Sequence, residues 1–178
     1  TGSPSGRRLE ARAHSTLSRH CLKRRVCLFG WLFPFTNSYL IMILKDQTIE
    51  LYIKEKMKVS SAHRTPERTA AYVRAARENG IKVLIAGAGA AAHLAGVVAA
   101  ETTLPVIAVP IDATSLRGLD ALLAMVQMPA GIPVATMAIG KAGARNAGIF
   151  AAQILSVENA DVAKALKEQR SKMAAGVE

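Results

Sequence analysis

The chain has 178 residues, of which 51% are hydrophobic and 20% are charged. This composition is typical of a globular domain with a substantial core, and it excludes a disordered chain. The formal net charge is +10, but residues 1–60 hold 11 Lys and Arg against 4 Asp and Glu, whereas residues 61–178 hold 12 against 9. Because the excess lies mostly in the first third and no nucleic-acid motif accompanies it, we expect no nucleic-acid partner.

Residues 1–57 differ in composition from the rest of the chain. We interpret them as an atypical basic and hydrophobic leader, followed by a domain at residues 58–178. The 19 residues of Val26–Leu44 carry no charge and have basic residues before them. That pattern would suit a membrane-spanning helix, but Pro34 and several polar residues argue against it, and we expect no membrane partner. A transit peptide and a non-native leader are the other two interpretations.

Both cysteines of the chain, Cys21 and Cys27, belong to this leader. The domain therefore needs neither disulfides nor a thiolate metal site, which suits a reducing compartment. We expect a cytoplasmic protein, or an organellar one if the leader is a transit peptide.

From residue 58 onward, strands alternate with helices. After an extended run that ends at Ser60, Thr65-Pro66-Glu67 predicts a helix start, with Thr as the N-cap, Pro in the first turn and Glu at the positive end of the dipole. That helix is expected to end at Asn79-Gly80. Further strands are expected at 81–86, 104–110 and 133–139, and further helices from the turn at 87–90 to about 101, and at 116–126, 140–155 and 160–173.

This alternation predicts an α/β fold with a parallel sheet and helices on both faces. In such folds, ligands bind beyond the carboxyl ends of the strands. The rule selects the loops Ser60–Thr65, Gly87–His93 and Pro110–Ser115. Two of these loops contain the only histidines outside the leader, His63 and His93. We therefore expect a functional site at this edge.

His63 follows a strand and precedes a capped helix, and an imidazole there can give and take a proton near neutral pH. A histidine that only caps or fills the loop is the alternative. Arg64 offers a planar fork for a phosphate or carboxylate, unless it forms an ordinary surface ion pair.

The second loop, Gly87–His93, is a turn of small residues whose backbone N–H groups could hold an anion. Close helix packing would explain its glycines equally well. His93 could line the pocket or be buried structure. No cluster with metal-ligand spacing and no Ser–His–Asp order is present, so metal-dependent hydrolysis is not expected.

These motifs resemble the N5-carboxyaminoimidazole ribonucleotide mutase family of purine biosynthesis over residues 58–156. The matching segments are Ser61-Ala62-His63-Arg64-Thr65-Pro66, Ala86-Gly87-Ala88-Gly89, Ala91-Ala92-His93-Leu94, Thr103-Leu104-Pro105-Val106, Val126-Gln127-Met128-Pro129, Pro133-Val134-Ala135-Thr136, Ala138-Ile139-Gly140 and Asn146-Ala147-Gly148. The resemblance implies a three-layer, flavodoxin-like domain, a homo-octamer and an aminoimidazole ribonucleotide substrate, without metal or organic cofactor.

The same resemblance implies the roles of individual residues. It makes His63 the catalytic general acid and base of a carboxylate migration that proceeds by decarboxylation and recarboxylation. It makes Ser61 and Arg64 substrate-binding residues, with Arg64 on the phosphate. The remaining implied substrate-binding residues, which form the wall around the imidazole and carboxylate, are Ala86, Gly87, Ala88, Gly89, His93 and Leu94.

The chain departs from the family at its N-terminal end. The family begins with a strand running into a Gly-Ser-x-Ser-Asp loop that holds substrate. Here Gly2-Ser3-Pro4-Ser5 is followed by Gly6 and lies 59 residues before Ser61, roughly twice the family's spacing. Residues 41–58 are expected to supply a helix end and a second strand. A non-catalytic paralogue that lost the N-terminal loop is therefore an alternative to the mutase. A carboxylase that uses AIR and free CO2 is another, because the same pocket would serve both reactions.

Overall fold

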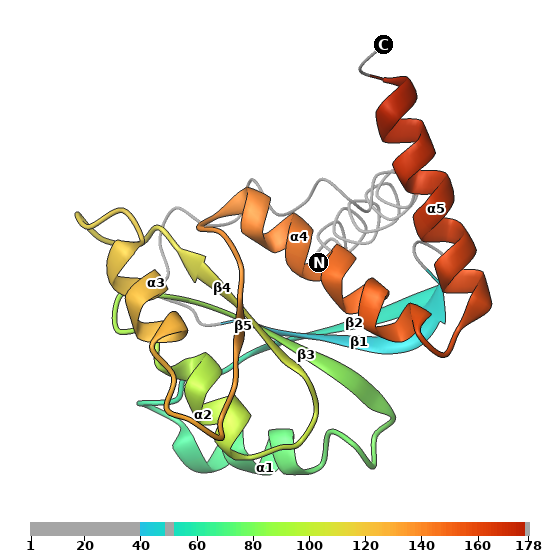
Figure 1. The fold of residues 1–178 in the computed structure, drawn as a ribbon. Helices are drawn as coiled ribbons and strands as arrows, with labels where there is room; N and C mark the ends of the chain where they lie inside the picture. Colours follow the sequence, from blue (N-terminus) through green and yellow to red (C-terminus); the bar gives the residue numbers. More distant parts are fainter. Residues whose placement is uncertain (1–39, 49–51, 177–178) are drawn as a thin grey trace, which may run out of the picture. The chain divides into compact units, whose positions relative to one another are not determined.

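The computed structural model describes residues 40–48 and 52–176. The chain divides into residues 1–36 and residues 37–178, and every described element belongs to the second unit. The elements are β1 (Leu40–Thr48), β2 (Tyr52–Val59), α1 (Pro66–Arg74), β3 (Ile81–Gly89), α2 (Leu94–Ala100), β4 (Val106–Ile111), α3 (Leu119–Val126), β5 (Ala135–Thr136), α4 (Lys141–Ser156) and α5 (Ala160–Ala175) (Figure 1). The boundary drawn from composition, at residues 57 and 58, falls at the end of β2. Whether residues 1–57 form a leader stays a prediction.

The five strands form one sheet in the order β2-β1-β3-β4-β5. β3, β4 and β5 run parallel, as the alternation of strands and helices predicts. The order is that of flavodoxin-like folds, in which the ligand binds where the strand order reverses, between β1 and β3. The α/β fold class is confirmed.

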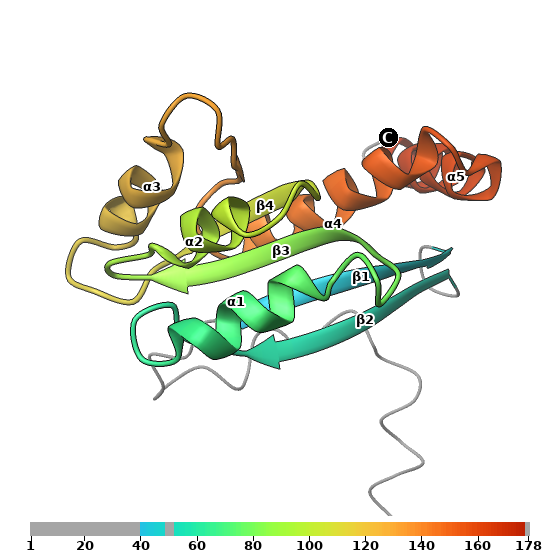
Figure 2. The ribbon, with the colours of Figure 1, turned by 90° about the horizontal axis from the view of Figure 1, so that it is seen from below.

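β1 departs from the all-parallel expectation, because it pairs antiparallel with both β2 and β3. Its first residue, Leu40, lies opposite Val59 on one side and Gly87 on the other. β1 therefore begins at the edge where β2 and β3 end (Figure 2), and its last residue, Thr48, lies at the far edge. The helix end predicted within residues 41–58 is wrong for the described part of that range, which is strand, whereas the second strand is confirmed as β2.

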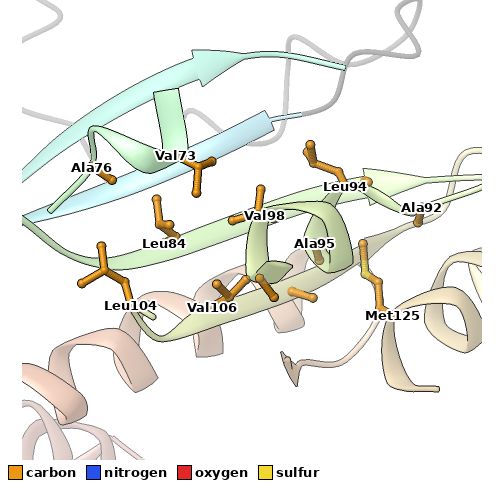
Figure 3. Close-up of a cluster of buried hydrophobic side chains, with 14 of the residues drawn as sticks. Val73, Ala76, Leu84, Ala92, Leu94, Ala95, Val98, Leu104, Val106 and Met125 are labelled. Carbon is orange, nitrogen blue, oxygen red and sulfur yellow. The ribbon is translucent and has the colours of Figure 1, made fainter. Parts of the chain in front are cut away.

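Side chains of β3 alternate between two layers of helices. Leu84, Ala86 and Ala88 join a buried cluster with α1, α2 and α3, whereas Val83 and Ile85 join another with α4. Figure 1 shows α1 and α2 on one side of the sheet and α4 on the other, and Figure 3 shows side chains of the first cluster. The three-layer arrangement is confirmed, and a strand that is apolar on both faces lies within it.

Several predicted elements are shorter in the structure, among them α1 and β5. Regular helix α1 ends at Arg74, and turns lead on to Gly80, whose φ of +72° favours glycine. β5 has only two residues, because beyond it the chain follows β4 through isolated hydrogen bonds that Met137 and Gly140 donate. The later helices α3, α4 and α5 match their predicted ranges to within three residues.

The uncharged run Val26–Leu44 lies largely outside the described residues. Its described part, Leu40–Leu44, belongs to strand β1 and not to a helix. Among the residues that the structure describes, no helix has the length and apolar character needed to cross a membrane. The described part of the run therefore gives no support to the membrane-spanning interpretation.

Tyr72 on α1 carries a buried hydroxyl for which the described contacts provide no hydrogen-bond partner. Burial raises the pKa of this phenol above its ordinary value of 10.0. We expect Tyr72→Phe to raise the free energy of unfolding at pH 7 by up to about 1 kcal/mol, because it removes an unpaired polar group. The variant keeps the ring, which lies 5.7 Å from the Lys58 ammonium.

The same variant has a second expected effect at alkaline pH. Because burial makes the charged phenolate more costly in the folded than in the unfolded chain, the stability of the wild type falls as pH rises from the unfolded pKa through the folded pKa. Urea unfolding at pH 7 and at about pH 10.5 should therefore show a larger loss of stability in the wild type than in Tyr72→Phe. A variant less stable than the wild type at pH 7 would mean that the hydroxyl is satisfied.

Candidate functional site

The loop between β2 and α1 is closed by hydrogen bonds between Ser61 and Thr65. The Thr65 hydroxyl donates to the Ser61 carbonyl oxygen at 3.0 Å, and the Thr65 backbone N–H donates to the same oxygen at 2.9 Å. The Ser61 hydroxyl oxygen accepts a hydrogen bond from the Arg64 backbone N–H at 3.2 Å. The loop is thus held in one conformation, with the exposed side chains of His63 and Arg64 between its closed ends.

A buried pair of hydroxyls joins the start of this loop to helix α1. Ser60 Oγ and Thr69 Oγ1 lie 2.6 Å apart, and Thr69 is fully buried. The Thr69 hydroxyl also donates to the Thr65 carbonyl oxygen at 3.0 Å. Sequence reasoning missed this support, and the available signal was a threonine one helical turn after the N-cap, on the helix face that meets the core. Thr65 is the N-cap residue as predicted, but its side chain bonds to Ser61 and not to the helix.

The second loop is shorter than predicted. The sequence predicts that Gly87–Gly89 turn into a helix, and this is wrong: these residues extend β3 and pair with β4. The turn is confined to residues 90–93, and Ala90 adopts a left-handed φ of +56°, which is uncommon for alanine. A Cβ on Gly89 would lie 2.5 Å from Ala113 Cβ, so the third loop packs against the end of β3.

The two histidine loops meet. His63 Nε2 lies 2.9 Å from His93 Nδ1, a hydrogen-bond distance, and the ring centroids are 5.0 Å apart with the planes at 89°. Both imidazoles are exposed. The expectation that the histidines gather at the carboxyl edge of the sheet is confirmed, and their direct pairing is a finding of the structure.

The other predicted site residues lie around this pair in different environments. Ala86, Ala88 and Leu94 have their side chains in the core, so any contact from them to a ligand runs through backbone. Beyond Gly87, which pairs with the first residue of β1, the backbone of β3 continues past that strand to Gly89. Among the described residues, Ala88 and Gly89 of β3 therefore have no paired residue on β1.

Arg64 is exposed, and the ion pair that the structure describes joins Arg74 and Glu101 instead. The surface ion pair considered as an alternative for Arg64 is thus absent from the described contacts. No group of three or more His, Cys, Asp or Glu side chains within the described ranges could hold a metal ion. The arrangement brings together two imidazole rings and, next to His63 in the chain, the exposed Arg64 guanidinium.

The fold defines a flavodoxin-like α/β protein, and the paired histidines lie at the edge where folds of this class bind their ligands. Residues 39–176 match the family model described as AIR carboxylase. The chain is 60% identical over 121 residues to the N5-carboxyaminoimidazole ribonucleotide mutase of Bacillus subtilis (strain 168), covering 68% of this chain and 75% of that protein. The chain therefore belongs to the AIR carboxylase family.

Two further mutases, from other organisms, are also similar to this chain. The mutase of the same name from Pyrococcus abyssi (strain GE5 / Orsay) is 57% identical over 118 residues, covering 66% of this chain and 67% of that protein. That of Escherichia coli (strain K12) is 49% identical over 120 residues, covering 67% and 71%. The resemblance drawn from the sequence motifs is confirmed.

Proposed function

We propose that this chain acts in purine biosynthesis and converts N5-carboxyaminoimidazole ribonucleotide into 4-carboxy-5-aminoimidazole ribonucleotide. The observation that carries the proposal is the coincidence of the family match with the paired histidines. The 60% identity extends over 121 residues, and His63 and His93 lie 2.9 Å apart at the ligand-binding edge of the same domain.

The reaction needs one proton delivered and one proton removed. Breaking the carbamate C–N bond releases CO2 and leaves its electron pair on the exocyclic nitrogen, which takes a proton from the His63 imidazolium. The C4 carbon then forms a bond to the same CO2, and loss of the C4 proton to His63 restores the aromatic ring. One imidazole therefore serves as acid and then as base. Holding CO2 beside C4 replaces a bimolecular capture by an intramolecular step.

The other groups would bind and orient the substrate. Arg64, exposed next to His63, suits the phosphate through its planar fork. The Ser61 hydroxyl accepts the Arg64 N–H and can still donate its own proton to a ligand oxygen. The backbone of Ala88 and Gly89, beyond the first residue of β1, offers polar groups to the imidazole ring and the carboxylate.

The direction of β1 favours a second candidate, a paralogue with weak or no turnover. In the family resemblance, a substrate-holding loop follows the first strand. Here the carboxyl end of β1, Thr48, lies at the edge opposite His63, so a loop placed directly after β1 would begin at the far edge of the sheet from the histidine pair. We therefore expect the KM for the ribonucleotide to be raised. A carboxylase that takes AIR and free CO2 would use the same groups, and the description of the family model keeps it as an alternative.

We further propose that the chain forms a homo-oligomer, as the octamer implied by the resemblance, and works in the cytoplasm. Half-exposed apolar side chains follow one another along and before α3, namely Leu116, Leu119, Leu123 and Val126. Within α3, the spacing of Leu119, Leu123 and Val126 by four and three residues gathers them on one stripe, and a stripe of this kind favours contact with another subunit.

The test is an assay of the purified full chain on both substrates. We expect turnover of the carbamate substrate at a rate above that with AIR and bicarbonate, with a saturation curve shifted to high concentration. Light scattering on the same preparation would give the number of subunits. Faster turnover of AIR with bicarbonate would support the carboxylase, and no turnover of either substrate by a folded oligomer would support the non-catalytic paralogue.

A further inference from the structure

We infer that Thr69 is a positioning residue for the loop between β2 and α1, which carries His63 and Arg64. The inference rests on the proposed function and adds to it a fully buried residue that acts through the loop and not on the substrate. It begins from one atom, Thr69 Oγ1, whose hydrogen bonds reach both ends of that loop.

The Thr69 hydroxyl joins the start of the loop to its end. Ser60 Oγ, just before the loop, lies 2.6 Å from Thr69 Oγ1, and the Thr65 carbonyl oxygen, at the end of the loop, lies 3.0 Å from the same atom. A carbonyl oxygen can only accept, so the single hydroxyl hydrogen of Thr69 goes to Thr65. Ser60 then donates to Thr69. The reverse direction between these two hydroxyls would leave the contact with Thr65 without a hydrogen.

Both hydroxyls are shielded from water. Thr69 is 0% exposed and Ser60 is 7% exposed. Thr69 belongs to the face of α1 that also buries Val73, so valine would fit the apolar pattern of that face equally well. A buried pair of hydroxyls contributes little more to stability than an apolar pair of the same shape. The hydroxyls add direction instead, because a satisfied buried network fixes one arrangement of the groups that it joins.

The groups fixed in this way frame the exposed side chains of the loop. Thr65 bonds back to the Ser61 carbonyl oxygen through its N–H and its hydroxyl, and Ala62 packs against the buried cluster. His63 and Arg64 are the exposed residues between these anchors. A change in the distance between the two ends of the loop would therefore displace the imidazole and the guanidinium together.

The expected loss follows from the precision that catalysis requires. A reacting group must be held within about 0.5 Å of its productive position, and a misplacement of about 1 Å costs on the order of 100-fold in rate. The packing of Ala62 remains when the Thr69 hydroxyl is lost, and it limits the displacement. We therefore expect a loss nearer to about 10-fold.

The experiment compares Thr69→Val and Thr69→Ser in the full chain. Valine keeps the branched shape of threonine without the hydroxyl, whereas serine keeps the hydroxyl. We expect Thr69→Val to lower kcat on the carbamate substrate by about 10-fold and to raise KM, because His63 and Arg64 share the loop. Thr69→Ser should stay within about 2-fold of the wild type. Wild-type kcat and KM in Thr69→Val, or an equal loss in both variants, would overturn the inference.

Two further variants separate positioning from stability. Thr69→Val leaves the Ser60 hydroxyl buried without its acceptor, so it should also lower the Tm. The double variant Ser60→Ala/Thr69→Val removes both hydroxyls and should regain part of that Tm while kcat stays low. Thr102→Val removes a hydroxyl oxygen that accepts from the Leu104 N–H before β4, at the opposite edge of the sheet, and should lower the Tm with wild-type kcat. Recovery of kcat together with Tm in the double variant would overturn the inference.

Hydrogen–deuterium exchange tests the inference without any substrate. The Arg64 N–H donates to the Ser61 hydroxyl oxygen and the Thr65 N–H to the Ser61 carbonyl oxygen, so both amides report the closed loop. A peptide covering residues 61–65 should exchange faster in Thr69→Val than in the wild type, and at the wild-type rate in Thr69→Ser. Unchanged exchange in Thr69→Val would overturn the inference. Failure of the wild type to turn over either substrate, with faster exchange in Thr69→Val, would overturn only the proposed function.

Discussion

His63→Asn should lower kcat on the carbamate substrate by about 10³-fold, with KM and folded stability close to those of the wild type. Asparagine is polar and of similar reach, but it cannot take up and release a proton near neutral pH. The exposed position of His63 in its loop means that the substitution empties no core volume. Steady-state kinetics with the carbamate substrate, together with thermal unfolding, would measure both effects.

Lys82→Gln provides the control for this prediction. Lys82 is exposed on β3, which it shares with the site, but it lies near the amino end of the strand, away from the histidine pair. This variant should keep the wild-type kcat. Full activity in His63→Asn would contradict the assigned mechanism, because proton transfer would then have to proceed through another group.

Gly143→Ala should cost about 3 kcal/mol of folding free energy, the largest stability effect that we expect from a single added methyl group. Gly143 is buried in the first turn of α4, and a Cβ there would fall on the carbonyl group of Ala138. Since that obstacle is backbone, it cannot rotate away. Either α4 or the segment after β5 must therefore move.

The matched control is Gly148→Ala in the same helix. A Cβ at Gly148 would meet no other atom within 4 Å, so only the helix propensity of alanine acts. We expect it to raise stability by about 0.5–1 kcal/mol. Urea unfolding at one fixed protein concentration would compare the two variants, because self-association shifts apparent stability. Equal effects of both substitutions would contradict the close approach of Ala138.

Local sequence signals predicted most of the domain after residue 58. Pro66 and Thr65 mark a helix start by their own backbone preferences, and the apolar run from Ile81 marks a strand buried on both faces. These signals need no knowledge of distant partners. The alternation of elements then placed both histidine loops at one edge of the sheet, and the motifs identified the family.

Other features depend on contacts between distant segments, so no short stretch of the sequence indicates them. A strand has the same side-chain period in either direction, so nothing in Leu40–Thr48 indicated that β1 would run antiparallel to its neighbours. Small residues at Gly87–Gly89 suit a turn as well as a strand in close contact with a neighbour. Pairing with β4 decided for the strand.

The sequence by itself therefore determined the family, the layers of the domain and His63 as the candidate catalytic group. Only the tertiary structure decided that His93 bonds to that histidine, and that β1 ends at the edge opposite the pair. The physical reason is the same in both cases. Residue type and spacing act within one element, whereas a hydrogen bond between residues thirty positions apart and the direction of a strand arise only when elements pack together.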